Sequence, residues 1–382
     1  MLSYKKKVEG CMLLSSLLET IGFNNGNWEF NYNVELDSIE SAISMNYIIC
    51  NHYMMLGGIE NLNMKSFNSS DDTILMIATA KAVLDGGGEK NYIKYYLEYY
   101  NMLKEDIRIT GNTTLTSLEI LRLNKRMKAI SYNPKSGGNG CAIRTAPIGL
   151  KHYNDVNTLA MEALIASLAT HNYPLGYLGG IVSALFTSFA IKNINPFKWV
   201  EILLNMNSDQ FFINLIKKYY ETIGGLPDNY PEIYSKINEY FIYWQQYKDY
   251  RADKMKFRNL PIFVNYIEKI KHVAVFNSRD FKKGGWEHLG GSGLDSVIIA
   301  YDNLLLSVIP DNNMNVDTEA KVIKFDWRIF LYNNIFFFGD SDSVSAISGS
   351  WFGAYCGLDS FPMKQIETLE FYSEIKKIID KF

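Results

Sequence analysis

The residues best suited to chemistry are four aspartates in two short clusters that lie far apart in the chain. The upstream cluster is Ser70-Asp71-Asp72-Thr73, and the downstream cluster is Asp340-Ser341-Asp342-Ser343. Each stands before a stretch of apolar or small residues, where Ser and Asp commonly accept hydrogen bonds from the free N–H groups of a helix's first turn. Capping needs only one such residue per helix, so the additional carboxylates need another explanation.

If the two clusters meet in the fold, four carboxylates share one pocket. Like charges at that distance repel, and some of the groups take up protons unless cations lie between them. Two divalent cations would balance four negative charges, and all-oxygen ligands favour Mg²⁺, Mn²⁺ or Ca²⁺ over zinc. The alternative is two ordinary helix caps on opposite sides of the molecule, and the pattern alone leaves both interpretations open.

Composition indicates an ordinary globular protein with enough length for a large core. The chain has 382 residues, of which 47% are hydrophobic and 21% are charged, and its formal net charge is −3. The near-neutral charge argues against nucleic acid as the main partner. The four cysteines are scattered without a C-x-x-C pair, which argues against a zinc knuckle or a disulfide framework and favours free thiols in the cytoplasm.

Two apolar stretches have features of targeting or membrane segments. The stretch from Cys11 to Leu18 is short and is flanked by Glu9 and Glu19, so a signal peptide is not expected. The run from Tyr173 to Ile191 carries no charge and is long enough to span a membrane, but it contains Pro174 and many Gly, Ser and Thr residues. A buried helix that packs closely through small residues fits this run better than a membrane span.

Helical periodicity dominates the rest of the chain, and sustained period-two alternation is nearly absent. Neither an internal repeat nor a linker of domain-boundary character is evident. The sequence therefore predicts a large all-α bundle that forms one domain over residues 1–382. The expected helices cover residues 12–22, 74–85, 91–104, 113–128 and 157–169, a helix opened by Pro196, 209–223 capped by Ser208, 231–251, 295–306, 317–333, 343–356 and 364–381.

Three glycine-rich segments interrupt this pattern, at residues 24–30, 136–140 and 284–293. Glycine lets the backbone approach a ligand closely, and successive N–H groups can surround an anion such as a diphosphate. None of the segments matches a P-loop, and Gly138-Asn139-Gly140 does not follow a strand as a Rossmann fingerprint would. Taken alone, such loops are more often plain turns.

A set of short motifs occurs in a fixed order along the chain. In chain order, they are Asn25-Gly26-Asn27-Trp28-Glu29-Phe30, Ser70-Asp71-Asp72-Thr73, Gly138-Asn139-Gly140-Cys141-Ala142, Thr170-His171 with Pro174-x-Gly176-Tyr177-Leu178-Gly179, Ile299-Ala300-Tyr301-Asp302, and Gly339-Asp340-Ser341-Asp342-Ser343. Taken together, these motifs resemble the ADP-ribosylglycohydrolase family, and in particular its ADP-ribosylarginine hydrolase branch. The resemblance runs from about residue 10 to residue 360, and the ordered set is specific although each motif alone is weak.

The resemblance implies an orthogonal all-α fold with a two-metal cleft, in which two Mg²⁺ ions (or Mn²⁺) lie beneath ADP-ribose. The implied reaction is hydrolysis of the N-glycosidic bond between ADP-ribose and a protein arginine, which reverses mono-ADP-ribosylation. ADP-ribosylated proteins would be the substrate and ADP-ribose a product, and we expect a monomeric enzyme. The implied metal ligands are Ser70, Asp71, Asp72, Asp340, Asp342 and Ser343.

Further roles follow from the resemblance, residue by residue. Glu29 would lie near the scissile ribose as a charge stabiliser or a movable gate, and Asp72 or Asp342 would accept the proton of the attacking water. The implied catalytic set is Glu29, Asp71, Asp72 and Asp342. The implied substrate-binding set is Gly138, Asn139, Gly140, His171, Trp286, Gly290, Gly291 and Ser292, with the glycine segments offering backbone N–H groups to the diphosphate.

Several of these assignments have ordinary structural alternatives. His171 could instead be a helix C-terminal cap, and Trp286 could pack in the core. Arg144 could contact phosphate, but a structural ion pair is at least as plausible.

The sequence departs from the family pattern beside the site. The usual Gly-Asp pair reads Leu18-Glu19, the usual His-Gly-Gly reads Phe337-Phe338-Gly339, and Leu294 replaces a usual histidine. Two alternatives therefore stay open: hydrolysis of another ADP-ribosyl linkage, such as that to serine, or a non-catalytic ADP-ribose-binding relative.

Overall fold

The computed structural model describes residues 2–34, 39–253, 289–309, 323–336, 339–359 and 361–382. Within these ranges the regular structure is helical, with two isolated β-bridges and no β-strand, which confirms the all-α prediction. The helices are α1 (Tyr4–Phe23), α2 (Ile39–Met55), α3 (Gly58–Asn61), α4 (Asp71–Leu84), α5 (Gly88–Glu98), α6 (Tyr100–Leu103), α7 (Asn112–Asn124), α8 (Ala146–Lys151), α9 (Val156–Leu168), α10 (Pro174–Ile191), α11 (Trp199–Ser208), α12 (Phe211–Thr222), α13 (Tyr230–Asp253), α15 (Asp295–Leu306), α16 (Trp327–Ile335), α17 (Ser341–Cys356), α18 (Met363–Ile366) and α19 (Tyr372–Ile379).

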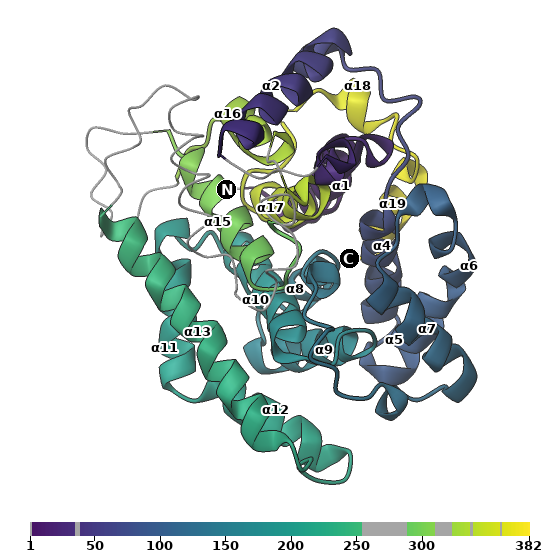
Figure 1. Ribbon diagram of the computed structural model, residues 1–382, viewed down its shortest axis with the longest axis vertical. Coiled ribbons are helices and arrows are strands. Elements are labelled where there is room, and N and C mark those ends of the chain that lie inside the picture. Colours follow the sequence, from purple (N-terminus) through teal and green to yellow (C-terminus); the bar gives the residue numbers. More distant parts are fainter. Residues whose placement is uncertain (1, 35–38, 254–288, 310–322, 337–338, 360) are drawn as a thin grey trace.

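Helices α1 and α17 lie against each other near the middle of the molecule, although they come from opposite ends of the chain (Figure 1). Their backbones touch, because a Cβ atom added at Gly353 would lie 2.0 Å from the carbonyl oxygen of Gly10. At the other end of the contact, Ser341 Oγ donates a hydrogen bond to the carbonyl oxygen of Gly22 at 2.9 Å. The first turn of α17, which carries the downstream acidic cluster, is therefore fixed to the end of α1.

Helix α10 corresponds to the uncharged apolar run in the sequence. It is long and apolar enough to cross a membrane, and all of its residues are buried inside the described structure. Its small residues allow close contacts: a Cβ at Gly179 would lie 2.3 Å from the carbonyl oxygen of Gly293, and a Cβ at Gly176 would lie 2.7 Å from that of Ser136. The prediction of a buried, closely packed helix is confirmed, and α10 serves as the base on which two glycine-rich loops rest.

The cysteines agree with expectation, since all four are free thiols.

Several helix boundaries differ from the sequence prediction. Ser208 does not cap α12, because it is the last residue of α11, where its hydroxyl donates to the carbonyl oxygen of Leu204 at 3.1 Å. The chain instead turns at Gln210, whose φ is 60°, before α12 begins at Phe211.

Other helices also differ from the sequence prediction. Helix α2 was not predicted, and the single helix expected over residues 364–381 is divided into α18 and α19. The expected helix over 317–333 is represented by α16 in the described part. By sequence, the mixed stretch 251–272 could form a shorter helix; it is described only to residue 253, where α13 ends, and the rest lies outside the described residues. The single-domain organisation stays a prediction.

Candidate active site

The two acidic clusters meet where α4 and α17 begin. Ser70 is the N-cap of α4, and its hydroxyl accepts a hydrogen bond from the N–H of Asp72 at 3.2 Å. Ser343, in the first turn of α17, donates from its hydroxyl to Asp72 Oδ2 at 3.0 Å. This contact excludes the interpretation that the clusters are separate helix caps on opposite sides of the molecule. It confirms that the two clusters lie together, as predicted.

A further acid, Glu29, joins the two clusters from the loop that follows α1. One carboxylate oxygen each from Glu29, Asp340 and Asp342 lie within 4.8 Å of one another, and all three residues are buried. The loop is attached to the start of α17, because the N–H of Phe30 donates to the carbonyl oxygen of Gly339 at 3.3 Å. The residue that the family resemblance placed near the scissile ribose thus stands beside the downstream cluster.

These carboxylates have lone pairs that the described protein does not use. Glu29 Oε2, Asp340 Oδ1 and Asp342 Oδ1 are buried and receive no hydrogen bond from any described residue. A buried carboxylate oxygen without a donor is costly, and three of them close together also repel. An all-oxygen set of this kind fits a hard divalent cation, which would satisfy the lone pairs and offset the charge.

The electrostatics of the cluster support the same interpretation. Burial raises the pKa of Glu29 well above its usual range, and the charges of Asp340 and Asp71 raise it further. Burial likewise raises the pKa of Asp342, with Glu29 and Asp340 adding to the effect. These shifts favour the protonated carboxyl groups, whereas a bound cation would favour their charged forms.

Asp71 and Asp72 are neighbours in the first turn of α4 but differ in surroundings. Asp72 is buried against Ser343, and burial followed by the charge of Asp71 raises its pKa well above the usual range. Asp71 is half-buried, and the loss of hydration raises its pKa to about 8. Asp72 therefore belongs to the interior of the cluster, whereas Asp71 lies on its more accessible side.

The two glycine-rich loops pair with each other next to the acids. Gly138 and Ser292 form an antiparallel bridge, and the N–H of Asn139 donates to the carbonyl oxygen of Gly291 at 3.2 Å. The Asn139 amide then donates to Asp340 Oδ2 at 3.0 Å and to the carbonyl oxygen of Gly290 at 2.9 Å. Asn139 thus joins both loops to the acidic cluster.

Several backbone N–H groups that were expected to receive a diphosphate already have acceptors. Asp295, at the start of α15, accepts from the N–H of Gly290 at 2.9 Å and from the N–H of Ser292 at 2.8 Å. The hydroxyl of Ser292 donates to the same carboxylate. A diphosphate at this loop would share or replace these bonds, so Asp295 shapes the loop that the sequence prediction treated as a free anion cradle.

His171 and Arg144 lie beneath the Gly138–Gly140 turn. Nδ1 of His171 shares a hydrogen bond with the Thr170 hydroxyl at 2.7 Å, and its ring is so close to the turn that a Cβ at Gly140 would lie 2.8 Å from Cε1. Burial, with the nearby charge of Arg144, lowers the pKa of His171 to about 3, so the imidazole is neutral at physiological pH.

Arg144 is fully buried and supports this turn from within. Its guanidinium donates to the carbonyl oxygens of Gly140 at 2.6 Å and Ala166 at 3.0 Å, and to the Thr170 hydroxyl at 2.6 Å. Since these donors are occupied, the structural alternative holds for Arg144, with carbonyl and hydroxyl oxygens as the hydrogen-bond partners in place of the expected ion pair.

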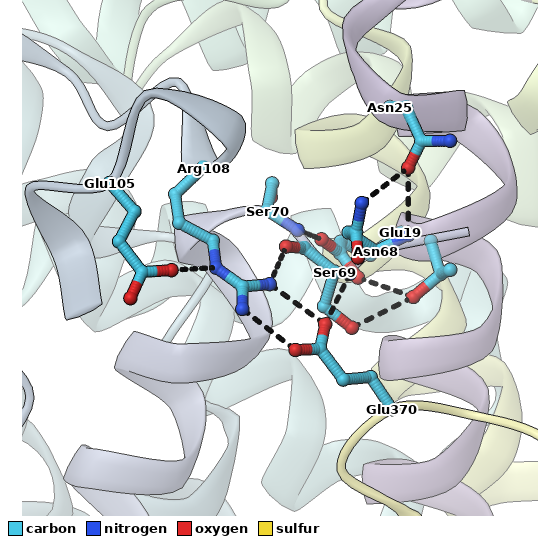
Figure 2. A network of polar contacts seen from close by, with 9 residues as sticks. Glu19, Asn25, Asn68, Ser69, Ser70, Glu105, Arg108 and Glu370 are labelled. Carbon is cyan, nitrogen blue, oxygen red and sulfur yellow. Dashed lines mark hydrogen bonds and ion pairs between the residues drawn. The ribbon is translucent and has the colours of Figure 1, made fainter. Parts of the chain in front are cut away.

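Three charged residues that the sequence analysis did not assign to the site lie behind the upstream cluster, and Figure 2 shows them in one network. Glu19 is fully buried in α1 and accepts a hydrogen bond from the N–H of Ser70 at 2.5 Å. Arg108 and Glu370 form an ion pair that contacts Ser69. A glutamate inside an apolar helix was a signal for Glu19, but the sequence had no local signal for the other two. Trp286 and Phe337-Phe338 lie outside the described residues.

Comparison with known proteins identifies the family of this chain. The family model described as ADP-ribosylglycohydrolase matches residues 2–382. "ADP-ribosylhydrolase ARH1" of Dictyostelium discoideum is 31% identical over 400 residues, which cover 97% of this chain and 92% of the relative. "Putative ADP-ribosyl glycohydrolase L444" of Acanthamoeba polyphaga mimivirus is 32% identical over 380 residues, which cover 94% of this chain and 66% of the relative.

A solved structure supports the fold independently. An "ADP-ribosylglycohydrolase-related protein complex" superposes with a TM-score of 0.54 and 18% sequence identity, covering 99% of this chain and 97% of that one. Identity at that level is evidence for a shared fold alone. Since the family model and both relatives match nearly all of its length, the chain is a hydrolase that belongs to the ADP-ribosylglycohydrolase family.

Proposed function

We propose that this protein is a Mg²⁺-dependent ADP-ribosylarginine hydrolase, which cleaves the N-glycosidic bond between ADP-ribose and an arginine side chain of a modified protein. The observation that carries the proposal is the convergence of buried Glu29, Asp340 and Asp342, with unsatisfied oxygens, next to the Asp72–Ser343 contact. The relative described as ADP-ribosylhydrolase ARH1 supports the choice of linkage class.

The residues that would hold two divalent cations come from both clusters. Bound cations would supply Lewis acidity, which lowers the pKa of a water and fixes the ribose hydroxyls. They would use the otherwise unsatisfied oxygens of Asp340 and Asp342. Mg²⁺ is proposed because the ligand atoms are all oxygens, and Mn²⁺ is a plausible substitute. The proposed ligands are Ser70, Asp71, Asp72, Asp340, Asp342 and Ser343.

Acidic side chains of the protein would accept the proton of the attacking water and stabilise the positive charge that develops during the reaction. The modified arginine carries a positive guanidinium, and its free form is strongly basic, so guanidine is a poor leaving group. Asp72 or Asp342 would accept the proton of the water that attacks C1″ while the C–N electron pair leaves with the guanidine. Glu29, next to Asp340 and Asp342, would stabilise the positive charge that develops on the ribose.

One assay tests the proposal. Full-length protein is incubated with arginine-linked and serine-linked ADP-ribosyl peptides, each with Mg²⁺ and with EDTA, and the released ADP-ribose is measured. Release from the arginine-linked peptide alone, abolished by EDTA, is expected. Release from the serine-linked peptide would assign a different linkage, and tight binding of ADP-ribose without turnover would contradict an enzymatic role.

A further inference from the structure

The two residues that precede the upstream aspartates are held from two sides by charged groups (Figure 2). On one side, the N–H of Ser69 donates to Glu370 Oε2 at 3.0 Å, and its carbonyl oxygen accepts from Arg108 Nη1 at 2.7 Å. On the other side, the N–H of Ser70 donates to Glu19 Oε1 at 2.5 Å. The backbone groups of Ser69 and Ser70, which precede Asp71, are therefore hydrogen-bonded to these charged side chains.

The outer side is a bidentate ion pair. Arg108 Nη1 and Nη2 each donate to one oxygen of Glu370 at 2.7 Å, and Glu105 lies 3.7 Å from Arg108 Nε. The Arg108 side chain is buried, and its guanidinium lies over the Phe371 ring. Two parallel hydrogen bonds fix the relative orientation of the guanidinium and the carboxylate. The pair therefore holds both side chains in position and also balances their charges.

The inner side is a fully buried carboxylate with both oxygens in use. Besides the N–H of Ser70, Glu19 accepts hydrogen bonds from the hydroxyls of Thr73 at 2.8 Å and Thr20 at 2.9 Å. Thr20 lies on α1 and Thr73 on the first turn of α4, so Glu19 joins the two helices at the point where the acidic cluster begins.

We propose that Glu19, Arg108 and Glu370 form a clamp on the Ser69–Ser70 backbone that sets the metal affinity of the upstream ligands. This inference rests on the proposed function, since it assigns the clamp to the metal ligands Ser70, Asp71 and Asp72. The three residues are positioning residues, because they act through the backbone. Metal ligands need placement within about 0.5 Å, and the clamp provides it before a cation binds, when the carboxylates repel one another.

The chain offers a closely matched control for the outer side of the clamp. Glu374 also belongs to the C-terminal segment and pairs with α4, where Lys81 Nζ lies 2.8 Å from its carboxylate. The side chains of Glu370 and Glu374 are 30% and 34% exposed. Lys81 lies in the last turn of α4, whereas the clamp acts next to its first turn. Loss of either ion pair weakens the attachment of the same segment, but only one pair touches the residues before Asp71.

The experiment compares full-length wild type with the variants Arg108→Lys, Glu370→Gln and Glu374→Gln. Mn²⁺ affinity is measured by electron paramagnetic resonance without substrate, together with the thermal midpoint and the apparent Mg²⁺ activation constant. Arg108→Lys and Glu370→Gln are expected to weaken Mn²⁺ affinity by about 10-fold or more, the usual effect of losing an outer-sphere support. At saturating Mg²⁺ their kcat should return close to that of wild type, and Glu374→Gln should keep the wild-type Mn²⁺ affinity.

The outcomes separate this proposal from the proposed function. If Arg108→Lys and Glu370→Gln bind Mn²⁺ as tightly as Glu374→Gln does, while all three lower the thermal midpoint, the ion pair only supports the fold and the clamp is refuted. If wild type binds Mn²⁺ but releases no ADP-ribose, the proposed reaction is wrong, and the affinity ranking still decides the clamp. Wild type that binds no Mn²⁺ overturns both.

Discussion

Ser343 Oγ donates a hydrogen bond to Asp72 Oδ2 at 3.0 Å, across 271 residues of sequence. This contact joins the first turn of α17 to the first turn of α4, so neither acidic cluster is positioned by its own helix alone. Residues that act as one unit show strongly non-additive effects when they are replaced. The clusters should therefore behave as one site in mutagenesis.

Removing one acid from either cluster should abolish activity without unfolding the protein. Asp72→Ala and Asp342→Asn each remove a carboxylate that is proposed both to hold a cation and to accept a proton. Losses of about 10²- to 10⁴-fold in kcat are expected, the range for a general base. ADP-ribose release measures the loss, and circular dichroism checks the fold. The double variant should be little worse than either single one, and wild-type turnover by Asp72→Ala or Asp342→Asn would refute the assigned roles.

Divalent cations should raise the thermal stability of the protein. Glu29, Asp340 and Asp342 have buried oxygens without a donor among the described residues, and their mutual repulsion opposes folding. A ligand that binds only the folded state at 100 times its Kd stabilises it by about 2.7 kcal/mol. Differential scanning fluorimetry with Mg²⁺, Mn²⁺ or EDTA should show the shift, and Asp342→Asn should reduce it. Identical midpoints with Mg²⁺ and with EDTA would contradict a metal site here.

The pH dependence of stability should differ between metal-free and Mg²⁺-bound protein. The pKa of Asp71 is raised from 3.8 to about 8, so the metal-free folded state holds a proton that the unfolded chain releases. Stability from this group is therefore complete below pH 4 and is lost as pH rises through about 8. Metal binding displaces such protons, so Mg²⁺ affinity should increase over the same interval.

Denaturant titrations of EDTA-treated protein between pH 5 and pH 9, repeated with saturating Mg²⁺, measure both effects. The metal-free series should lose stability toward high pH, and Mg²⁺ should remove or reverse that trend. A metal-free protein whose stability rises with pH across this interval would show that the carboxyl groups are charged in the folded state without a cation.

The sequence predicted the parts of the site that depend on local chemistry. Ser70 and the aspartates beside it predicted a helix start, and α4 begins at Asp71. The apolar pattern after Asp295 predicted a helix over 295–306, and α15 has these bounds. Local rules failed at Ser208, because a serine hydroxyl can also donate to a carbonyl oxygen one turn earlier in the same helix.

The remaining features depend on contacts between distant segments. Glu370 has no sequence pattern that indicates Arg108 as its partner, since 262 residues separate them. The N–H groups of Gly290 and Ser292 could not be known to donate to Asp295, because glycine-rich loops are judged from sequence by their backbone freedom alone. Helix α2 was missed for another reason: Tyr47, Ile48 and Met55 are exposed, so its apolar residues do not follow one buried face.

The contact between α1 and α17 should be intolerant of a single methyl group. A Cβ at Gly353 would lie 2.0 Å from the Gly10 carbonyl oxygen, so Gly353→Ala forces the two backbones apart. A loss of about 1–3 kcal/mol in the free energy of unfolding is expected, and more if the helices cannot shift. Gly111→Ala is the control, because nothing lies within 4 Å of its added Cβ. Urea denaturation of both variants tests this, and equal midpoints would contradict it.

The same pairing of α1 and α17 constrains how the protein is made. Ser15 on α1 donates to the carbonyl oxygen of Ala346 on α17 at 3.0 Å, across 331 residues. During synthesis α1 therefore keeps an apolar surface exposed until α17 has also left the ribosome. Contacts this distant form slowly and leave partly folded chains prone to association. Nascent chains should accordingly depend on chaperones, and the acidic site can form only after α17 has been synthesised.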